Sequence, residues 1–187
     1  ELYPSEDENY TITSLGPGSS SGQRVKVSGL GGFDKEYDNI THIFATDTQG
    51  TNNFIGIDGE VTATVAINVG KSVIGQNIFG LGGGAATVHG GGNLDTVTFG
   101  SGGGTFVGGA GQSTITDNSG GHVTVRAPGF AHYVLTNGSL TYDNGGTLYV
   151  SSFEGNSVKK VVLNGAANAT YETSSLPDPT TGVASPW

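Results

Sequence analysis

Four side chains in one part of the chain are of the types that carry out acid–base chemistry: His122, Arg126, His132 and Tyr133. A histidine or tyrosine can move the proton beside a carboxylate, and an arginine can neutralise that carboxylate. Such a group would suit a lyase or epimerase acting on an acidic polysaccharide, as β-helix enzymes do. However, no run of basic residues supports it, and an acidic surface repels a polyanion. We therefore expect a protein that is not an enzyme, with a carbohydrate-binding or polysaccharide-modifying domain as the alternative.

The composition excludes several other functions. The 187 residues carry a net charge of −9 with only seven scattered lysines and arginines, so nucleic acid is not an expected partner. No stretch approaches the roughly 20 apolar residues of a membrane span. The absence of cysteine excludes disulfides and thiolate chemistry. The chain is rich in Gly, Ser, Thr and Asn and only 12% of it is charged, which favours a secreted protein, extracellular or at the cell surface.

The clearest pattern is a nine-residue repeat between residues 81 and 116. Four units follow one another without a gap: LGGGAATVH, GGGNLDTVT, FGSGGGTFV and GGAGQSTIT. Glycines crowd the first half of each unit and a short alternating stretch follows, which predicts a turn and then a strand. A fixed period of this kind is typical of a parallel β-solenoid, whose stacked units bury a narrow core. The predicted core ladder is Val88, Val97, Phe106 and Ile115, and the threonine before each is expected to face outward.

The rest of the chain extends this fold. Ten of the sixteen acids lie in the first 60 residues, among short alternating stretches. We predict an acidic N-terminal β cap or small subdomain over residues 1–70, and a Gly-rich solenoid over residues 71–175. Residues 176–187 contain three prolines and are predicted to form an extended tail. The predicted fold class is all-β, a parallel β-solenoid of the β-roll or β-helix kind.

The unit GGAGQSTIT resembles the G-G-x-G-x-D-x-U-x repeat of the hemolysin-type (RTX) family of secreted bacterial proteins, where U is a large apolar residue. The resemblance implies a β-roll that holds calcium between aspartates two repeats apart. The aspartate position is occupied by Ala86, Asp95, Gly104 and Ser113, and the residues two repeats from Asp95 are Asn77 and Ser113. Calcium takes six to eight oxygens, carboxylates among them. We therefore expect no cofactor and a stack held by packing; Asp95 with Asn77 would form a weak calcium site at most.

A second group of acids alternates as the ligands of a calcium loop do: Asp34, Glu36 and Asp38. The helix–loop–helix calcium loop also needs a glycine at its sixth position and a glutamate at its twelfth, where this chain has Asn39 and Ala45. The pattern therefore favours an exposed acidic loop, with a weak calcium site as the alternative.

For the function, the sequence favours a secreted bacterial surface or extracellular-matrix protein with a structural or adhesive role. The end of a solenoid offers unpaired backbone groups, so one expected partner is another copy of the chain in an end-to-end fibre. Neighbouring surface proteins and polysaccharides are the other expected partners. A third hypothesis is ice binding, because Thr96, Thr98, Thr114 and Thr116 would form a flat array on one face.

Overall fold

The computed structural model describes the backbone of most of the chain, namely residues 8–46, 52–69, 75–92, 94–108, 112–119, 123–126, 130–135, 138–143, 147–153, 158–164, 171–173, 176–177 and 184–185. Within these ranges, side chains are described as far as Arg126, except those of Glu8 and Gln112. The described residues form β-strands and one short 3-10 helix, η1 (Leu30–Gly32). None of their helices could span a membrane.

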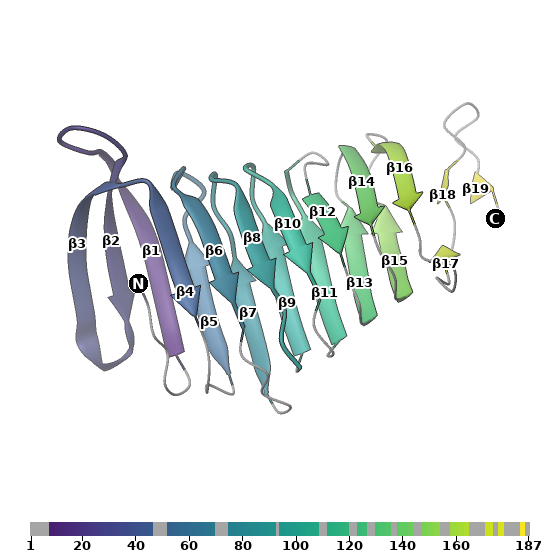
Figure 1. The fold of residues 1–187 in the computed structure, drawn as a ribbon, viewed down its shortest axis with the longest axis horizontal. Helices are drawn as coiled ribbons and strands as arrows, with labels where there is room; N and C mark the ends of the chain where they lie inside the picture. The colour runs from purple at the N-terminus through teal and green to yellow at the C-terminus, as the bar shows by residue number, and fades with distance from the viewer. Residues whose placement is uncertain are drawn as a thin grey trace.

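Two large sheets face each other and share one core (Figure 1). The ten-stranded sheet has the order β17 (Tyr171–Thr173), β15 (Thr147–Phe153), β13 (Phe130–Leu135), β11 (Gln112–Asp117), β9 (Leu94–Phe99), β7 (Gln76–Gly80), β5 (Asn53–Ile57), β1 (Glu8–Pro17), β2 (Gln23–Gly29) and β3 (Phe33–Ile40). The seven-stranded sheet has the order β16 (Val158–Asn164), β14 (Gly138–Asp143), β12 (Val123–Arg126), β10 (Gly104–Val107), β8 (Ala86–His89), β6 (Thr64–Asn68) and β4 (His42–Thr46).

From β4 to β17 the chain alternates between the two sheets, one strand in each. Neighbouring strands of the solenoid are parallel, including the pairs β1–β5, β5–β7, β4–β6 and β6–β8. The protein is therefore an all-β chain arranged as a parallel β-solenoid, and the predicted fold class is confirmed.

The nine-residue period of the sequence is half a turn of this solenoid. In the ten-stranded sheet, Asn77 pairs with Asp95, Asp95 with Ser113 and Ser113 with Ala131, so partners are two repeats apart. The intervening unit crosses to the seven-stranded sheet and returns. Each repeat thus supplies one strand and one turn, and successive repeats add to opposite sheets.

Glycine is required where the turns stack on one another. A Cβ added at Gly84 would lie 2.0 Å from the carbonyl oxygen of Ala63, and one added at Gly102 would lie 2.3 Å from the carbonyl carbon of Gly84. Neither position has room for a side chain, because the backbone of the preceding turn occupies that space. The glycines in the first half of each repeat therefore allow the close stacking of successive turns.

The core runs between the sheets as far as β12, the last strand whose side chains are described. Val88, Val97, Phe106 and Ile115 are fully buried at 0% exposure. Val88 pairs with Phe106 in the seven-stranded sheet, and Val97 pairs with Ile115 in the ten-stranded sheet. The predicted ladder is therefore two ladders, one on the inner face of each sheet.

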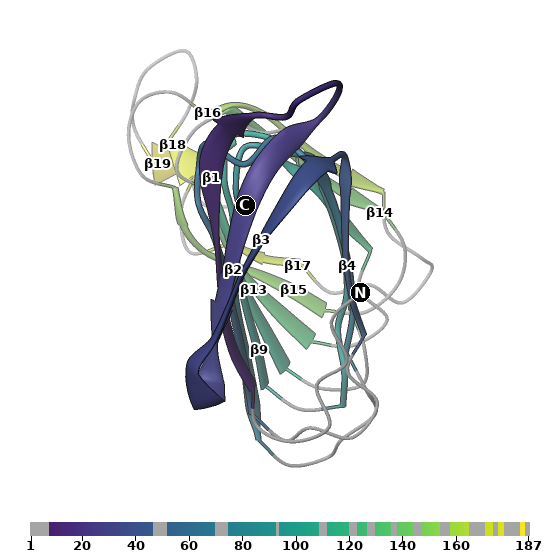
Figure 2. The same ribbon diagram turned by 90° about the vertical axis from the view of Figure 1, so that its left-hand side faces the viewer.

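The solenoid begins earlier in the chain than residue 71, where the sequence analysis placed its start. β4, β5 and β6 already pair in parallel with later strands, so residues 1–70 are not a separate β region. Among the strands of the two large sheets, only β2 and β3 lie outside the parallel stack; they continue the ten-stranded sheet as antiparallel strands. Figure 2 shows β2 and β3 in front of the N-terminal end of the stack, where Val25 and Val27 of β2 join the core.

At the other end, the predicted extended tail contains two short strands. β18 (Leu176–Pro177) and β19 (Ala184–Ser185) pair antiparallel with each other in a small third sheet. The tail thus turns back on itself within residues 176–187.

Candidate functional site

A ladder of polar side chains runs through the core near the start of four strands. This polar ladder consists of Asn53, Asn77, Asp95 and Ser113, which are register partners on β5, β7, β9 and β11 and are at most 3% exposed. Asn53 Nδ2 donates to Asn77 Oδ1 at 2.9 Å, and Asn77 Nδ2 donates to Asp95 Oδ1 at 2.8 Å. The backbone N–H of Gly91 donates to Asp95 Oδ2 at 2.9 Å. Hydrogen bonds thus link successive turns inside the core.

Asp95 is the acid of this ladder, and its surroundings act on it in opposite directions. Burial raises the pKa of the Asp95 carboxyl, although the hydrogen bonds from Asn77 and Gly91 favour its charged form. Both of its oxygens accept hydrogen bonds from N–H groups, and Asn77 presents its amide nitrogen to Asp95. A calcium ion would need oxygens there instead. In the described ranges, no group of three or more His, Cys, Asp or Glu residues is placed to hold a metal ion.

On the outer face of the ten-stranded sheet, the described side chains of β1, β5, β7, β9 and β11 are all uncharged. Its outward positions alternate with core positions along each strand. Three large apolar side chains lie there, Phe54 and Ile78 at 39% exposure and Leu94 at 50%. We call this surface the neutral face; it consists of Asn9, Thr11, Thr13, Phe54, Gly56, Gln76, Ile78, Gly80, Leu94, Thr96, Thr98, Thr114 and Thr116.

The middle of the neutral face is flat because two neighbouring positions have no side chain. Gly56 and Gly80 are register partners, as are Phe54 and Ile78. The Phe54 ring leans along β5 over Gly56, since a Cβ added there would lie 3.2 Å from the ring's Cε1 and 3.3 Å from its Cζ. Leu94 lies on β9, diagonally across from Ile78. We call these five residues the Phe54 patch.

Threonines continue the neutral face beyond this patch. Thr96 pairs with Thr114, and Thr98 pairs with Thr116, on β9 and β11. The four side chains thus form the flat array that the sequence predicts. On the other sheet the matching outward positions are less regular, since Thr87 pairs with Thr105 but His89 pairs with Val107.

The three acids predicted to lie in a loop, Asp34, Glu36 and Asp38, are instead on β3, the edge strand. They lie on the same side of the sheet as the neutral face, together with Arg24 and Lys26 of β2. We call these five side chains the charged cap. The extended backbone of a strand, rather than a tight loop, separates the carboxylates, and Asp34 and Asp38 have different partners.

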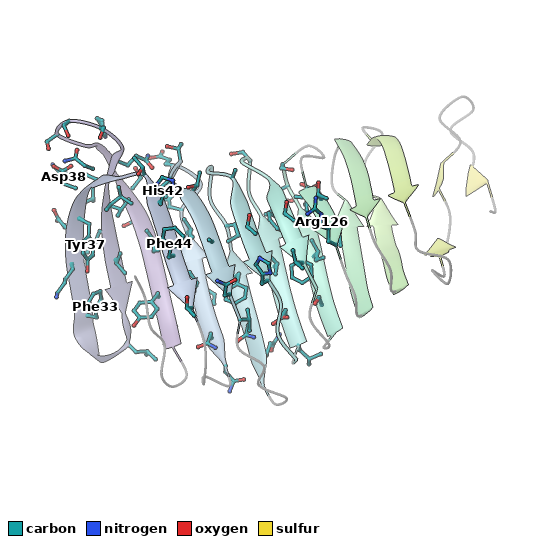
Figure 3. All side chains as sticks on the ribbon, in the orientation of Figure 1. Phe33, Tyr37, Asp38, His42, Phe44 and Arg126 are labelled. Atoms are coloured by element: carbon teal, nitrogen blue, oxygen red, sulfur yellow. The ribbon has the colours of Figure 1, made fainter. Side chains whose placement is uncertain are left out.

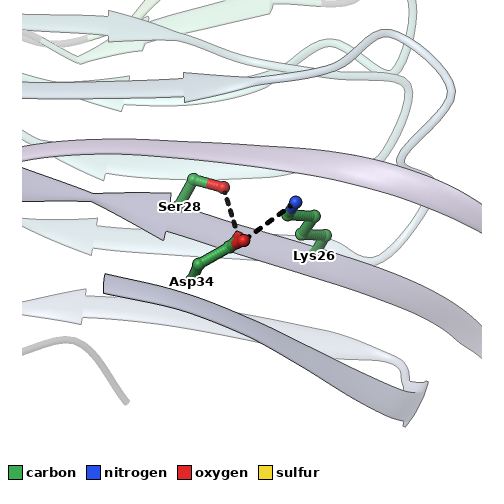
Figure 4. Close-up of polar contacts among 3 residues, drawn as sticks. All are labelled: Lys26, Ser28 and Asp34. Atoms are coloured by element: carbon green, nitrogen blue, oxygen red, sulfur yellow. Dashed lines mark hydrogen bonds and ion pairs between the residues drawn. The ribbon is translucent and has the colours of Figure 1, made fainter. Parts of the chain in front are cut away.

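The partners of the cap carboxylates are nearby side chains. Asp34 forms an ion pair with Lys26 at 3.0 Å and accepts a hydrogen bond from the Ser28 hydroxyl at 3.0 Å (Figure 4). These two contacts lower the pKa of the Asp34 carboxyl. The hydroxyl and the N–H of Ser19 donate to Asp38 and lower its pKa in the same way. The contacts of Asp34 and Asp38 thus favour the charged forms of these two carboxyls, whereas burial raises the pKa of Asp95.

The candidate acid–base residues do not converge on one face. Arg126 is exposed at the end of β12 in the seven-stranded sheet (Figure 3), whereas His132 and Tyr133 belong to β13 in the ten-stranded sheet. His122 lies outside the described residues. Among the described side chains of the seven-stranded sheet, an exposed aromatic pair lies on β4, where the rings of His42 and Phe44 stack with their centroids 6.3 Å apart.

Comparison of the chain with protein-family models, curated protein sequences and solved structures gives no match. No relative therefore adds a functional residue to those found in the structure. The apolar part of the neutral face was not predicted from the sequence. Its one signal was the alternation in NFIGI and QNIFG, which places Phe54 and Ile78 on the side opposite the core.

Proposed function

We propose that this chain is a structural and adhesive module of an extracellular surface, and that it holds its partner against the neutral face. The observation that carries the proposal is the absence of charge from a broad, flat, exposed sheet face, in the described part of a chain with a net charge of −9. A water-exposed surface normally mixes charges with few large apolar groups, and exposed apolar patches mark interaction sites.

The sheet is also suited to binding without rearrangement. Each strand of the neutral face is fixed by a paired strand on both sides and by the core beneath it. Threonine is β-branched and has few rotamers, so little side-chain freedom is lost on contact. A rigid surface of this kind can hold a partner at low entropic cost.

The test adds two like charges to one face at a time. Thr96→Glu/Thr114→Glu places them on the neutral face, and Thr87→Glu/Thr105→Glu places them at a register pair on the other sheet as a matched control. We expect the first variant alone to lose retention on phenyl-agarose and on uncharged agarose, and to lose any self-association seen by sedimentation velocity. Equal behaviour of the two variants would contradict the proposal.

End-to-end fibre growth is less well supported than contact through the neutral face. β3, at the N-terminal edge of the ten-stranded sheet, carries the acids of the charged cap and also Lys35, which shares the inner side with Val27. Charged and inward-pointing side chains on an edge strand oppose pairing with another chain. Negative-stain electron microscopy tests the end-to-end alternative. It would be favoured by fibres that lengthen with protein concentration and that still form in Thr96→Glu/Thr114→Glu.

Ice binding is a second candidate function, favoured by the in-register pairs Thr96–Thr114 and Thr98–Thr116. It requires a flat, regular, uncharged array, and the neutral face has one. This candidate would be supported if the wild-type protein depressed the freezing point. The effect should be lost in Thr98→Glu and kept in Thr124→Glu on the other sheet. A freezing point equal to that of a protein-free buffer would remove it.

A further inference from the structure

We propose that the partner of the neutral face is a neutral polysaccharide, and that one of its sugar rings stacks on Phe54. This inference rests on the proposed function and names the chemistry of its partner. It differs from a site built on His122, Arg126 and His132, which would need an acidic substrate.

The charge of the surface selects the class of polysaccharide. A uronate or sulfated chain would meet no cation on the neutral face, and the net charge of −9 would repel it. A neutral sugar chain needs no cation partner and is not repelled by the net charge. The match in charge therefore favours a polymer without ionised groups.

The Phe54 patch fits the apolar side of a sugar ring. The aliphatic C–H groups of a pyranose carry small positive partial charges, and the face of an aromatic ring is negative, so the two attract when they stack. Phe54 is 39% exposed and leans over Gly56, where no side chain blocks the approach. Gly80 extends this open area to the next strand, and Ile78 lies beside the ring as its register partner.

The surrounding side chains suit the hydroxyl groups of the same partner. A sugar hydroxyl both donates and accepts hydrogen bonds, as do the hydroxyl of threonine and the amide of glutamine. Gln76 is exposed beside the patch, and Thr96 and Thr98 follow on β9. A permanent contact between two copies would favour a more continuously apolar surface. The mixture of one ring, two aliphatic groups and several hydroxyls favours a polyhydroxylated partner.

The test is affinity electrophoresis of the full chain in gels containing hydroxyethyl cellulose, a mixed-linkage β-glucan, galactomannan or polygalacturonate. We expect retardation by at least one of the neutral polymers and none by polygalacturonate. Phe54→Ala should weaken the affinity obtained from the retardation about tenfold. This is the upper end of the range expected for the loss of an aromatic stacking contact. Phe44→Ala is the matched control, since Phe44 is 53% exposed on the other sheet, and it should bind as the wild type does.

Phe54→Tyr, which keeps the ring, should restore binding, and circular dichroism of each variant checks that it folds. Retardation by polygalacturonate alone, by no polymer, or equally in Phe54→Ala and the wild type would overturn the inference. The inference could fail in this way while Thr96→Glu/Thr114→Glu still abolished retention on phenyl-agarose and agarose, or self-association. The proposed function would then stand, with a partner other than a neutral polysaccharide. If that variant also behaved as its control does, the proposed function would fail as well.

Discussion

The outer face of the ten-stranded sheet has two parts with opposite chemistry. On β2 and β3 it carries the charged cap, and from β1 to β11 the described residues present the neutral face. Both parts lie on the same side of one sheet, so the difference does not follow from exposure. The charges of the cap follow instead from their place at the edge of the sheet, because an edge strand must avoid pairing with other chains.

Edge protection explains the charges of the cap, but it does not explain their absence from the neutral face. A solvated sheet surface would fold equally well with lysines and glutamates at its outward positions. The alternation of the strands turns these positions away from the core, and yet they hold Phe54, Ile78, Leu94 and a threonine array. We infer that contact with a partner, rather than folding, accounts for this composition.

The largest effect is expected where the neutral face rests on the core. Ile115 is 0% exposed and lies between two outward threonines on β11. Ile115→Ala should lower the free energy of unfolding by about 2–5 kcal/mol, since it removes buried methyl groups and leaves a cavity. Thr114→Ala, one residue away on the neutral face, should change it by no more than about 0.5 kcal/mol. Urea unfolding followed by circular dichroism measures both, and similar losses would show that the outward threonine has a folding role.

A smaller loss of stability is expected inside the sheet, at the polar ladder. Asp95→Ala leaves the Asn77 amide and the Gly91 N–H without their acceptor, at a cost of about 1–3 kcal/mol. The same urea experiment tests this. A variant as stable as the wild type would mean that the ladder hydrogen bonds contribute nothing net.

Asp34 of the cap and Asp95 of the core should titrate with opposite effects on stability. The pKa of Asp95 is raised in the folded state, so its contribution is most favourable below the unfolded pKa and is lost as pH rises through the folded value. The pKa of Asp34 is lowered, so its contribution is present above the unfolded pKa and is lost as pH falls through the folded value. As pH rises from 3 to 7, the stability of Asp95→Asn should therefore increase relative to that of the wild type. The stability of Asp34→Asn should decrease relative to that of the wild type. Parallel pH profiles would contradict the assignment.

The smallest effect on stability is expected from removing charge at the edge. Lys35→Thr/Glu36→Gln lies on an exposed strand and should alter the free energy of unfolding by about 0.5 kcal/mol or less. It should nevertheless promote self-association through β3, which Thr96→Glu/Thr114→Glu does not prevent. Sedimentation velocity distinguishes the two routes. If the edge variant stayed as monodisperse as the wild type, the charges of β3 would have no protective role.

The sequence was most informative where its period was regular. Within residues 81–116 every repeat has the same length, so the core positions and the outward threonines could be placed correctly on opposite sides. Between β5 and β7 the spacing is longer: Asn53 pairs with Asn77, 24 positions further on. The extra residues fall between the strands, and no periodicity shows how many there are. The pairing of Phe54 with Ile78 could therefore be found only from the structure. The same holds for the apolar part of the neutral face.

The N-terminal region was misjudged for a different reason. Alternating acids suggested a loop, because the ligands of a calcium loop alternate in the same way. An antiparallel edge strand tolerates them, and β3 is such a strand. Strand order depends on contacts between distant parts of the chain, so an edge cannot be recognised from local sequence.

The most direct test of the central claim is to locate the surface that a bound partner covers. The chain has no cysteine, so Thr98→Cys on the neutral face and Thr124→Cys on the seven-stranded sheet each provide a unique site for a nitroxide spin label. The two threonines are similarly half-buried. Collision of the label with a soluble paramagnetic reagent is measured before and after the protein binds phenyl-agarose or a neutral polysaccharide. We expect the label at position 98 to become protected and the label at position 124 to remain accessible. Protection at position 124 with continued access at position 98 would show that the neutral face is not the contact surface.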